Sequence, residues 1–193
     1  MRKLIVSNLI SLDGYASGPG GDVMALPFDT TFSDYNLELM QAADTLVSGA
    51  TTYRGFVSYW PPIADDPTQP EVERAISRRH RELEHLVISN SLTDDETGPW
   101  LENTRIVGRD EAPEVIAQAK EGEGGTLLVF GSMTTWNDLF AAGLVDELHM
   151  MVGAGVLIDG VPAFSARPPG PMTLTDARQL GDSNIALLTY SLG

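Results

Sequence analysis

The chain has 193 residues and carries 27 acidic against 12 basic side chains, which gives a formal net charge of −15. This charge opposes non-specific binding to nucleic acid or anionic lipid, since such binding depends on Lys and Arg neutralising phosphates. The chain has no cysteine, so disulfides, thiolate metal sites and cysteine nucleophiles are excluded.

The amino terminus predicts a cytoplasmic protein. Met-Arg-Lys is followed by the apolar run Leu4–Ile10, which Asp13-Gly14 stops before it reaches the length of a signal peptide. No apolar stretch approaches the roughly 20 residues that span a bilayer. At roughly 100 to 200 residues per domain, we expect a single domain over residues 1–193.

Strand-like and helix-like segments alternate along most of the chain. Short β-branched runs that end in Gly, Ser or Asn predict strands, and segments with helical periodicity lie between them. In chain order we expect a strand at Lys3–Ile10, a helix at Phe32–Ala43, a strand at Asp44–Ser48, helices at Thr51–Ser58 and Glu71–Glu82, strands at His85–Ser89 and Thr104–Val107, a helix at Ala112–Gly122, a strand at Thr126–Phe130, a helix at Thr134–Ala142 and a strand at Glu147–Val152. This alternation is typical of an α/β fold in which helices cover both faces of a mostly parallel central sheet.

The carboxyl-terminal segment departs from that alternation. Met172–Leu180 and Asn184–Leu192 are two strand-like runs joined by Gly181-Asp182-Ser183, which predicts an antiparallel hairpin. The hairpin would leave an apolar edge at residues 186–188, and edges of this kind are usually covered. We therefore expect a homodimer, which a monomeric mass in light scattering would contradict.

Three predicted strands end in turns suited to anion binding. Thr126–Phe130 leads into Gly131-Ser132-Met133-Thr134, and an earlier strand leads into Gly49-Ala50-Thr51-Thr52. A glycine at such a junction lets the backbone approach a ligand, and the helix that follows offers free N–H groups and the positive end of its dipole. Ser89 and Asn90 follow a third strand. Three such turns, each at the carboxyl end of a strand and along one edge of the sheet, would suit a dinucleotide.

Each of these turns, taken alone, could also be only a tight connection between elements. The chain contains neither the G-x-G-x-x-G fingerprint nor a P-loop, so an NTPase is excluded. Because the chain is strongly acidic, helix dipoles and backbone amides would have to supply much of the positive potential for a polyanionic cofactor. No group of His, Asp and Glu has metal-ligand spacing, so we expect no metal site.

Several motifs, taken in order, carry a resemblance to a known superfamily. They are Ser11-Leu12-Asp13-Gly14, Gly49 through Tyr53, Tyr59-Trp60-Pro61, Val87-Ile88-Ser89, Gly131-Ser132, Ala142 through Leu148, Val156-Leu157-Ile158 and Phe164. The chain resembles the dihydrofolate reductase-like superfamily, specifically the branch related to the reductase domain of bifunctional riboflavin-biosynthesis deaminase/reductases. The resemblance covers nearly the whole chain and implies a three-layer fold with a mostly parallel central sheet and an antiparallel edge hairpin.

The resemblance also implies a reduced nicotinamide dinucleotide as cofactor. Gly131, Ser132, Met133 and Thr134 would meet its pyrophosphate, Gly49, Thr51 and Thr52 would lie near its phosphates, and Ser89 and Asn90 would face its adenosine end. The family commonly has arginine at the positions of Ala50 and Asn90, where an arginine fork would bind a ribose 2′-phosphate. The resemblance implies NADPH, and NADH is left open because Ala50 and Asn90 replace those arginines, for which Arg54 could compensate.

The substrate side departs from the same family. Riboflavin-pathway reductases usually have Lys after S-L-D-G and Glu before the glycine of the pyrophosphate turn, whereas this chain has Tyr15 and Phe130. These aromatic residues should weaken recognition of a phosphorylated pyrimidine. Gly14 and Trp60 are the candidate substrate-binding residues, since Trp60 at a loop mouth could stack on a flat substrate. Trp60 could instead pack in the core with its aromatic neighbours.

Two aspartates are candidate catalytic acids. The segment Leu26-Pro27-Phe28-Asp29 resembles the one in which dihydrofolate reductases present their active-site acid, where a buried carboxylate relays a proton to a ring nitrogen. Asp29 could instead be a helix cap. Asp13 stands in an Asp-Gly pair and could be only a turn residue.

The three histidines are not candidates for catalysis. His80 and His85 flank the arginines at positions 78, 79 and 81, and this charged run predicts a solvated helix face. His149 lies in a predicted strand and is expected to occupy a sheet face rather than to shuttle protons.

These observations together predict an NAD(P)H-dependent reductase. It would transfer a hydride to a small planar heterocycle that resembles 5-amino-6-(5-phosphoribosylamino)uracil or a pterin, with the nicotinamide supplying the hydride. One alternative is a genuine dihydrofolate reductase. Another, of a different class, is a nucleotide-binding or ligand-sensing protein without turnover.

Overall fold

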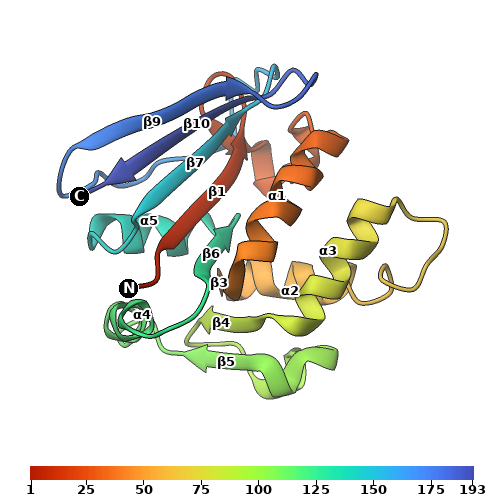
Figure 1. Cartoon of the computed structure of the whole chain (residues 1–193), viewed down its shortest axis with the longest axis vertical. Helices are drawn as coiled ribbons and strands as arrows, with labels where there is room; N and C mark the ends of the chain where they lie inside the picture. Colours follow the sequence, from red (N-terminus) through yellow and green to blue (C-terminus); the bar gives the residue numbers. More distant parts are fainter.

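The computed structural model describes residues 1–193 and shows helices on both faces of an eight-stranded sheet (Figure 1). The strand order is β5-β4-β3-β6-β1-β7-β10-β9. The strands are β1 (Leu4–Ile10), β3 (Ala43–Gly49), β4 (Glu84–Ile88), β5 (Thr104–Val107), β6 (Thr126–Phe130), β7 (Glu147–Val152), β9 (Met172–Gln179) and β10 (Ala186–Leu192). The α-helices are α1 (Thr30–Ala42), α2 (Ala50–Tyr59), α3 (Glu71–Glu82), α4 (Ala112–Glu121) and α5 (Met133–Ala141). None of them is both long enough and apolar enough to cross a membrane.

The sheet confirms the predicted fold. The strands from β5 to β7 pair in parallel, and the terminal hairpin of β9 and β10 pairs antiparallel with β7. Each predicted helix and strand is present within a few residues of its expected bounds. The chain also forms a small antiparallel pair of β2 (Tyr15–Ser17) and β8 (Val161–Pro162), together with four short 3-10 helices, η1 (Pro19–Gly21), η2 (Val23–Ala25), η3 (Asp94–Glu96) and η4 (Gly98–Asn103), all of which the sequence reading missed.

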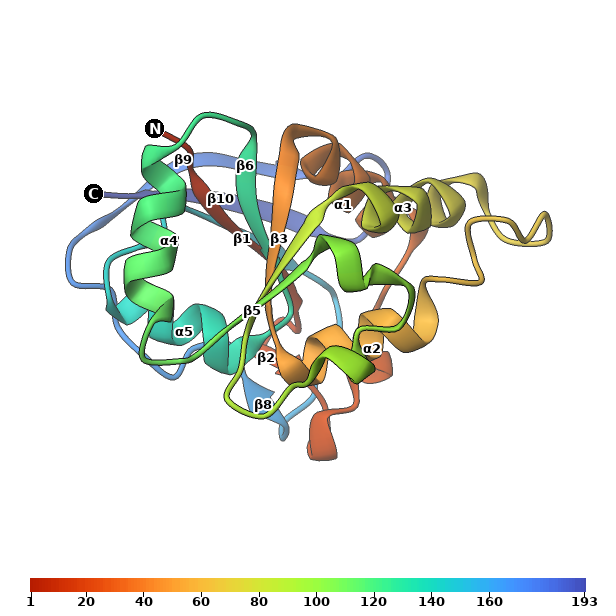
Figure 2. The ribbon, with the colours of Figure 1, turned by 90° about the horizontal axis from the view of Figure 1, so that it is seen from below.

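Two apolar cores separate the three layers. On one face, Ile116 of α4 and Phe140 of α5 pack against strand residues in a cluster of 19 buried side chains. On the other, Met40 of α1 and Ile76 of α3 belong to a second cluster. The successive β3 residues Leu46 and Val47 fall in different cores because side chains alternate across a strand. Figure 2 shows α4 and α5 on one side of the sheet and α1, α2 and α3 on the other.

The sheet has edge strands at β5 and β9, and the edge that the terminal hairpin leaves is β9 and not the segment expected from the sequence. Residues 186–188 belong to β10, which pairs with β7 on one side and with β9 on the other, and Leu187 is fully buried. The predicted apolar edge at residues 186–188 is therefore wrong. Nearly all of β9 is exposed, including Met172 and Leu174. Association of two copies through this hairpin stays a prediction.

His149 occupies the sheet face predicted for it and ties β7 to α1. Its Nδ1 lies 2.7 Å from the hydroxyl of Tyr35, and its Nε2 lies 3.1 Å from Glu147 Oε2. The other oxygen of that carboxylate accepts from Lys3 Nζ at 2.5 Å. Burial raises the pKa of Tyr35 to about 12 and lowers the pKa of His149. The pair therefore stays uncharged near neutral pH and acts as a packed, hydrogen-bonded link between layers.

The prediction of a solvated face around His80 and His85 is wrong for both histidines. Each is only 1% exposed. Their rings form a stack with Trp100, whose centroid lies 5.2 Å from His80 and 4.7 Å from His85, and Trp60 stacks on His80 at 5.2 Å. Arg81 is exposed, whereas Arg78 and Arg79 are half-buried and Arg79 donates to the carbonyls of Met40 and Ala43. The charged run therefore interleaves partly exposed arginines with buried histidines.

This stack predicts that the protein loses stability in mild acid. Burial lowers the pKa of both His80 and His85, so the unfolded chain takes up protons first as the pH falls. Their contribution to stability is complete above their ordinary pKa of 6.5 and declines below it, by at most about 1.4 kcal/mol per pH unit for each histidine. Urea unfolding at about pH 7.5 and about pH 5.5 measures this, and His80→Phe should flatten the dependence. If the free energy of unfolding of His80→Phe changed with pH as much as that of the wild type, buried His80 would not be a source of the acid sensitivity.

Candidate functional site

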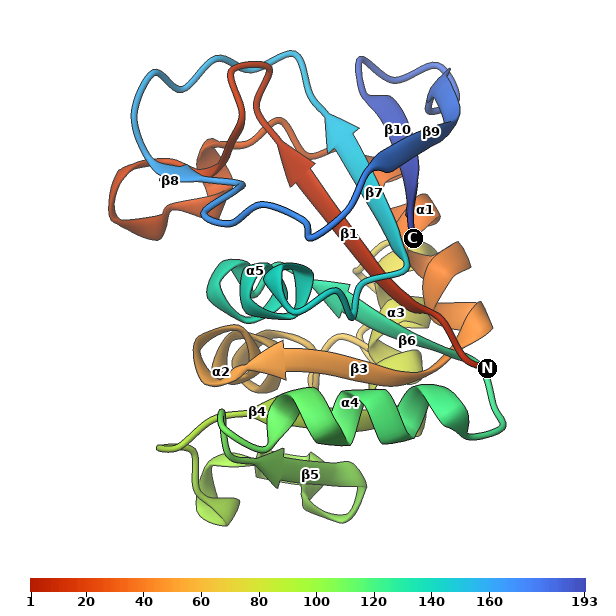
Figure 3. The same ribbon diagram turned by 90° about the vertical axis from the view of Figure 1, so that its left-hand side faces the viewer.

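The candidate site lies where the chain changes direction at the carboxyl edge of the sheet. From β3 the chain continues through α2 to β4, away from β1, whereas from β6 it continues through α5 and crosses β1 to reach β7. Such switch points leave a crevice outside the carboxyl ends of adjacent strands, where α/β proteins bind ligands. Figure 3 shows the starts of α2 and α5 side by side at this edge.

Reciprocal hydrogen bonds join the two turns. The Ser132 hydroxyl accepts from the N–H of Gly49 at 3.0 Å, and the N–H of Ser132 donates to Thr52 Oγ1 at 3.1 Å. A third bond runs from the N–H of Gly131 to Asn8 Oδ1 of β1 at 2.8 Å. The turn after β3, the turn after β6 and the middle of β1 are therefore fixed relative to one another.

The β6–α5 turn has an unusual backbone. Gly131 and Ser132 both have positive φ, 58° and 50°, and Ser132 lies in the left-handed helical region. That conformation is costly for a serine and persists only where the surroundings enforce it, which is typical of ligand sites. Here the bonds to Gly49 and Thr52 enforce it.

The first turns of α2 and α5 are free to receive an anion. Neither helix has a side-chain cap, and neither has an acidic residue in its first turn. By contrast, Asp29 caps α1, and α3 and α4 carry glutamates in their first turns. Free N–H groups and the positive dipole ends of α2 and α5 therefore converge on a region without carboxylates of their own. The side chains of Thr51 and Thr134 lie exposed in these turns.

The third turn, which follows β4 and contains Ser89 and Asn90, has a different hydrogen-bond pattern. The Ser89 hydroxyl accepts from the N–H groups of Ser91 and Leu92, both at 3.0 Å, and so closes its own turn. Asn90 Oδ1 accepts from the N–H of Arg109 at 2.8 Å, which ties the end of β4 to the turn after β5. Ser89 and Asn90 lie on the same edge as the other candidate cofactor residues, with their oxygens already engaged in shaping the backbone.

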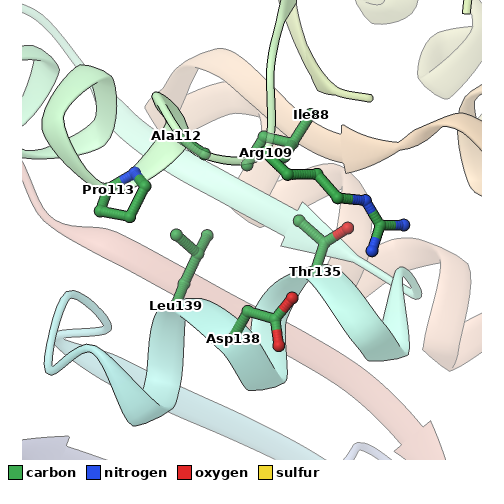
Figure 4. Close-up of a pocket in the computed structure, with 7 residues that line it drawn as sticks. All are labelled: Ile88, Arg109, Ala112, Pro113, Thr135, Asp138 and Leu139. Atoms are coloured by element: carbon green, nitrogen blue, oxygen red, sulfur yellow. The ribbon is translucent and has the colours of Figure 1, made fainter. Parts of the chain in front are cut away.

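A pocket lies between the turn after β4 and helix α5. Figure 4 shows the residues that line it, which are Ile88, Arg109, Ala112, Pro113, Thr135, Asp138 and Leu139. The sequence reading missed Arg109, Thr135 and Asp138, as well as Asn8. Arg109 had a detectable signal, because it follows a strand at the same edge as Gly49 and Gly131. No sequence signal points to the other three residues. Asn8 lies inside β1, and Thr135 and Asp138 lie inside α5, where neither the hydrophobic periodicity nor a motif distinguishes them from their neighbours.

Asp13 fastens one loop to another. Its carboxylate accepts from Ser11 Oγ at 2.6 Å and from the N–H groups of Leu157 and Ile158 at 3.1 and 2.7 Å. The bond from Ser11, followed by those from the two amides, lowers the pKa of Asp13 to about 2. The group is therefore ionised at neutral pH and holds the segment after β7 against the segment after β1. Gly14 beside it has a φ of 89°, and a Cβ added there would meet no atom within 4 Å.

Asp29 and Trp60 lie apart from the turns that join α2 to α5. Asp29 is exposed at the start of α1, where its Oδ1 accepts from the N–H of Phe32 at 3.0 Å, as a helix cap does. Trp60 follows the last residue of α2, a helix of ten residues and therefore about 15 Å long, at the end opposite Gly49. There it packs on His80 and Tyr59. The roles proposed for these two residues in catalysis and substrate binding stay predictions.

Comparison with known proteins identifies the family. The profile of the RibD C-terminal domain matches residues 2–185. The chain belongs to the RibD C-terminal domain family. This is a family of NAD(P)H-dependent reductases, and the fold is that of dihydrofolate reductase-like proteins. No match was found among curated proteins.

Solved structures agree with this assignment at the level of the fold. A putative riboflavin biosynthesis protein from Shewanella sp. PV-4 superposes with a TM-score of 0.69 at 21% identity, over 99% of both chains. The deaminase/5-amino-6-(5-phosphoribosylamino)uracil reductase of Thermotoga maritima gives 0.66 at 13% identity, over all of this chain and 57% of that one. A dihydrofolate reductase from Enterococcus faecalis, solved with NADP(H), gives 0.57 at 14% identity, over 99% of this chain and 96% of that one.

The fit of α5 against the β3–α2 turn predicts the effect of one substitution. A Cβ added at Gly49 would lie 2.6 Å from Thr135 Oγ1, so Gly49→Ala forces α5 away from the turn. We expect a loss of about 1–3 kcal/mol in the free energy of unfolding, measured by urea titration. The double variant Gly49→Ala/Thr135→Ala removes the clashing hydroxyl and should recover most of that loss. A single variant as stable as the wild type would show that the two turns are not in close contact.

Proposed function

We propose that this chain is an NAD(P)H-dependent reductase that binds the dinucleotide across the carboxyl edge of β3 and β6. The observation that carries the proposal is the pair of joined helix starts, α2 and α5, from which carboxylates are absent in a chain with 27 acidic residues. A pyrophosphate needs several N–H donors that converge from fixed directions, and this arrangement offers them without basic side chains.

The donor set fits a dinucleotide in further respects. The free N–H groups of Met133 and Thr134 would receive the pyrophosphate at the start of α5, with those of Thr51 and Thr52 opposite them. Gly131, Ser132 and Gly49 would shape the two turns, because their N–H groups already bind other residues of the chain. Asn8, at the same junction, is 4% exposed and has a buried Nδ2 whose two N–H groups lack a hydrogen-bond partner. The reduced nicotinamide supplies the hydride, and the residues of the chain bind, orient and shield it.

Direct titration tests this proposal. Protein fluorescence titrated with NADPH and NADH side by side should show saturable binding of at least one of them. Ser132→Ala should weaken this binding about tenfold or more, because it removes the hydroxyl that holds the two turns together. Ser183→Ala, at a buried serine in the distant hairpin turn, is the control. Wild-type protein that binds neither dinucleotide would contradict the proposal, and binding without oxidation by any substrate would favour the ligand-sensing alternative.

The distribution of charge restricts the substrate. The segments that follow β1 and β7, residues 11–29 and 153–166, contain four aspartates and no lysine or arginine. They expose an apolar set instead, formed by Leu12, Val23, Met24, Phe28, Val156, Ile158 and Phe164. Tyr15, at the position where the family usually has lysine, donates its hydroxyl to the carbonyl of Ile158 at 3.1 Å. We propose that the acceptor is a planar heterocycle without a phosphate, closer to a pterin or an unphosphorylated aminopyrimidine.

The substrate prediction is tested with a matched pair of compounds. With NADPH or NADH, whichever binds, 5-amino-6-ribosylaminouracil should be reduced with a kcat/KM at least about tenfold above that of its 5-phosphate, since each uncompensated charge contact costs this much or more. A preference for the phosphorylated compound would contradict the proposal. Arg167, the first cation after this segment, would then be the residue to substitute.

The alternative of a genuine dihydrofolate reductase depends on Asp29. In that case Asp29→Asn should abolish most turnover of dihydrofolate while leaving dinucleotide binding unchanged. The N-cap interaction with Phe32 survives in this variant, because asparagine caps helices as well as aspartate does. Turnover that is indifferent to Asp29→Asn would exclude this alternative.

A further inference from the structure

Most of the cations of this protein are paired with neighbouring carboxylates. Of its 12 lysines and arginines, nine lie within 4.0 Å of an acidic oxygen. The three that do not are Arg105, Arg109 and Arg167. A free guanidinium is thus rare here, and one of the three lines the pocket at the ligand-binding edge.

Arg54, which the sequence suggested as a compensating cation, is already engaged. Its guanidinium binds the carboxylate of Glu96 through two hydrogen bonds, at 2.6 and 3.1 Å. Glu96 also closes a capping box with Thr93 and is held in place by it. Recruiting Arg54 to a ligand would leave that carboxylate without its partner, so Arg54 is a poor candidate for binding a second anion.

Arg109 is held in position by its backbone. Its N–H donates to Asn90 Oδ1 at 2.8 Å, and the N–H of Gly108 donates to Glu111 Oε2 at 3.3 Å. These bonds fix the turn between β5 and α4 while the guanidinium makes no hydrogen bond to the protein. Asn90 therefore acts as a positioning residue, at a position where the family commonly has an arginine.

The exposed charged groups of the pocket bear on the ribose of a dinucleotide bound at this edge. Arg109 and Asp138 are the charged residues that line it, whereas Ile88, Ala112 and Leu139 are almost fully buried and form its apolar floor. A guanidinium matches a phosphomonoester through paired N–H bonds, whereas a carboxylate accepts from a ribose hydroxyl and repels a phosphate. Asp138 on α5 and Asp110 beside Arg109 in sequence oppose a phosphate, so any preference for one would be modest.

We propose that Arg109 is the residue by which this chain recognises a 2′-phosphate on the adenine ribose, and that Asp138 limits the resulting preference for NADPH over NADH. The inference rests on the proposed function, since it assumes that a nicotinamide dinucleotide binds at this edge. In this chain, the turn after β5 would bind the 2′-phosphate. The family commonly has arginines for this purpose at two other positions, which are Ala50 and Asn90 here.

The test compares the two dinucleotides on matched variants. Dissociation constants for NADPH and NADH are measured by fluorescence titration for the wild type, Arg109→Gln, Asp138→Asn and Arg105→Gln, with thermal midpoints to confirm folding. Arg109→Gln should weaken NADPH binding about tenfold or more and leave NADH within about twofold. Asp138→Asn should strengthen NADPH binding a few-fold. Arg105→Gln, which removes an equally free guanidinium from outside the pocket, should change neither.

The outcomes separate this inference from the proposed function. Wild-type protein that binds neither dinucleotide would contradict the proposed function itself. Two outcomes would overturn only the role of Arg109. One is wild-type protein that binds NADH but not NADPH. The other is an Arg109→Gln variant in which the dissociation constants for both dinucleotides change equally, or neither changes. Asn90→Ala offers an independent check. It removes the hydrogen bond from the N–H of Arg109, so it should also weaken NADPH binding more than NADH binding, but by less than Arg109→Gln does.

Discussion

The hydrogen bonds between the β3–α2 turn and the β6–α5 turn are the constraint on which the site depends. Ser132 accepts from Gly49 and donates to Thr52, so the starts of α2 and α5 cannot move independently. Using its hydroxyl in this way prevents Ser132 from capping α5, and the N–H groups of that helix stay free. The same contacts hold Ser132 in a left-handed conformation that it would not adopt alone.

The distribution of charge is consistent with the proposed binding of a dinucleotide at these turns. A chain with a net charge of −15 repels polyanions at long range, so binding one depends on local donors that fixed geometry supplies. Acidic residues are absent from the first turns of α2 and α5 although they flank the other helices. Most arginines and lysines are committed to ion pairs, which leaves Arg109 as the free cation that lines the pocket at this edge.

Several polar residues of the types found in catalytic sites make structural contacts, and the catalytic role of Asp13 stays a prediction. Asp13 binds two backbone N–H groups of the segment after β7 and so connects loops that are 144 and 145 residues apart in sequence. His149 and Tyr35 join β7 to α1, and His80 is part of a buried aromatic stack. Residue type alone cannot separate such roles from chemistry, because the same carboxylate or imidazole serves both purposes and only its neighbours decide.

The sequence by itself determined the α/β class, the parallel sheet with its terminal hairpin and the turns at Gly49 and Gly131, because hydrophobic periodicity and glycine placement act over a few residues. It also carried the family resemblance. Only the tertiary structure decided that β9 is the edge strand of the terminal hairpin, that His80 and His85 are buried, and that Thr135 and Arg109 line one pocket. Strand order and side-chain neighbours depend on contacts between distant segments, and no local pattern encodes which strand lies beside which.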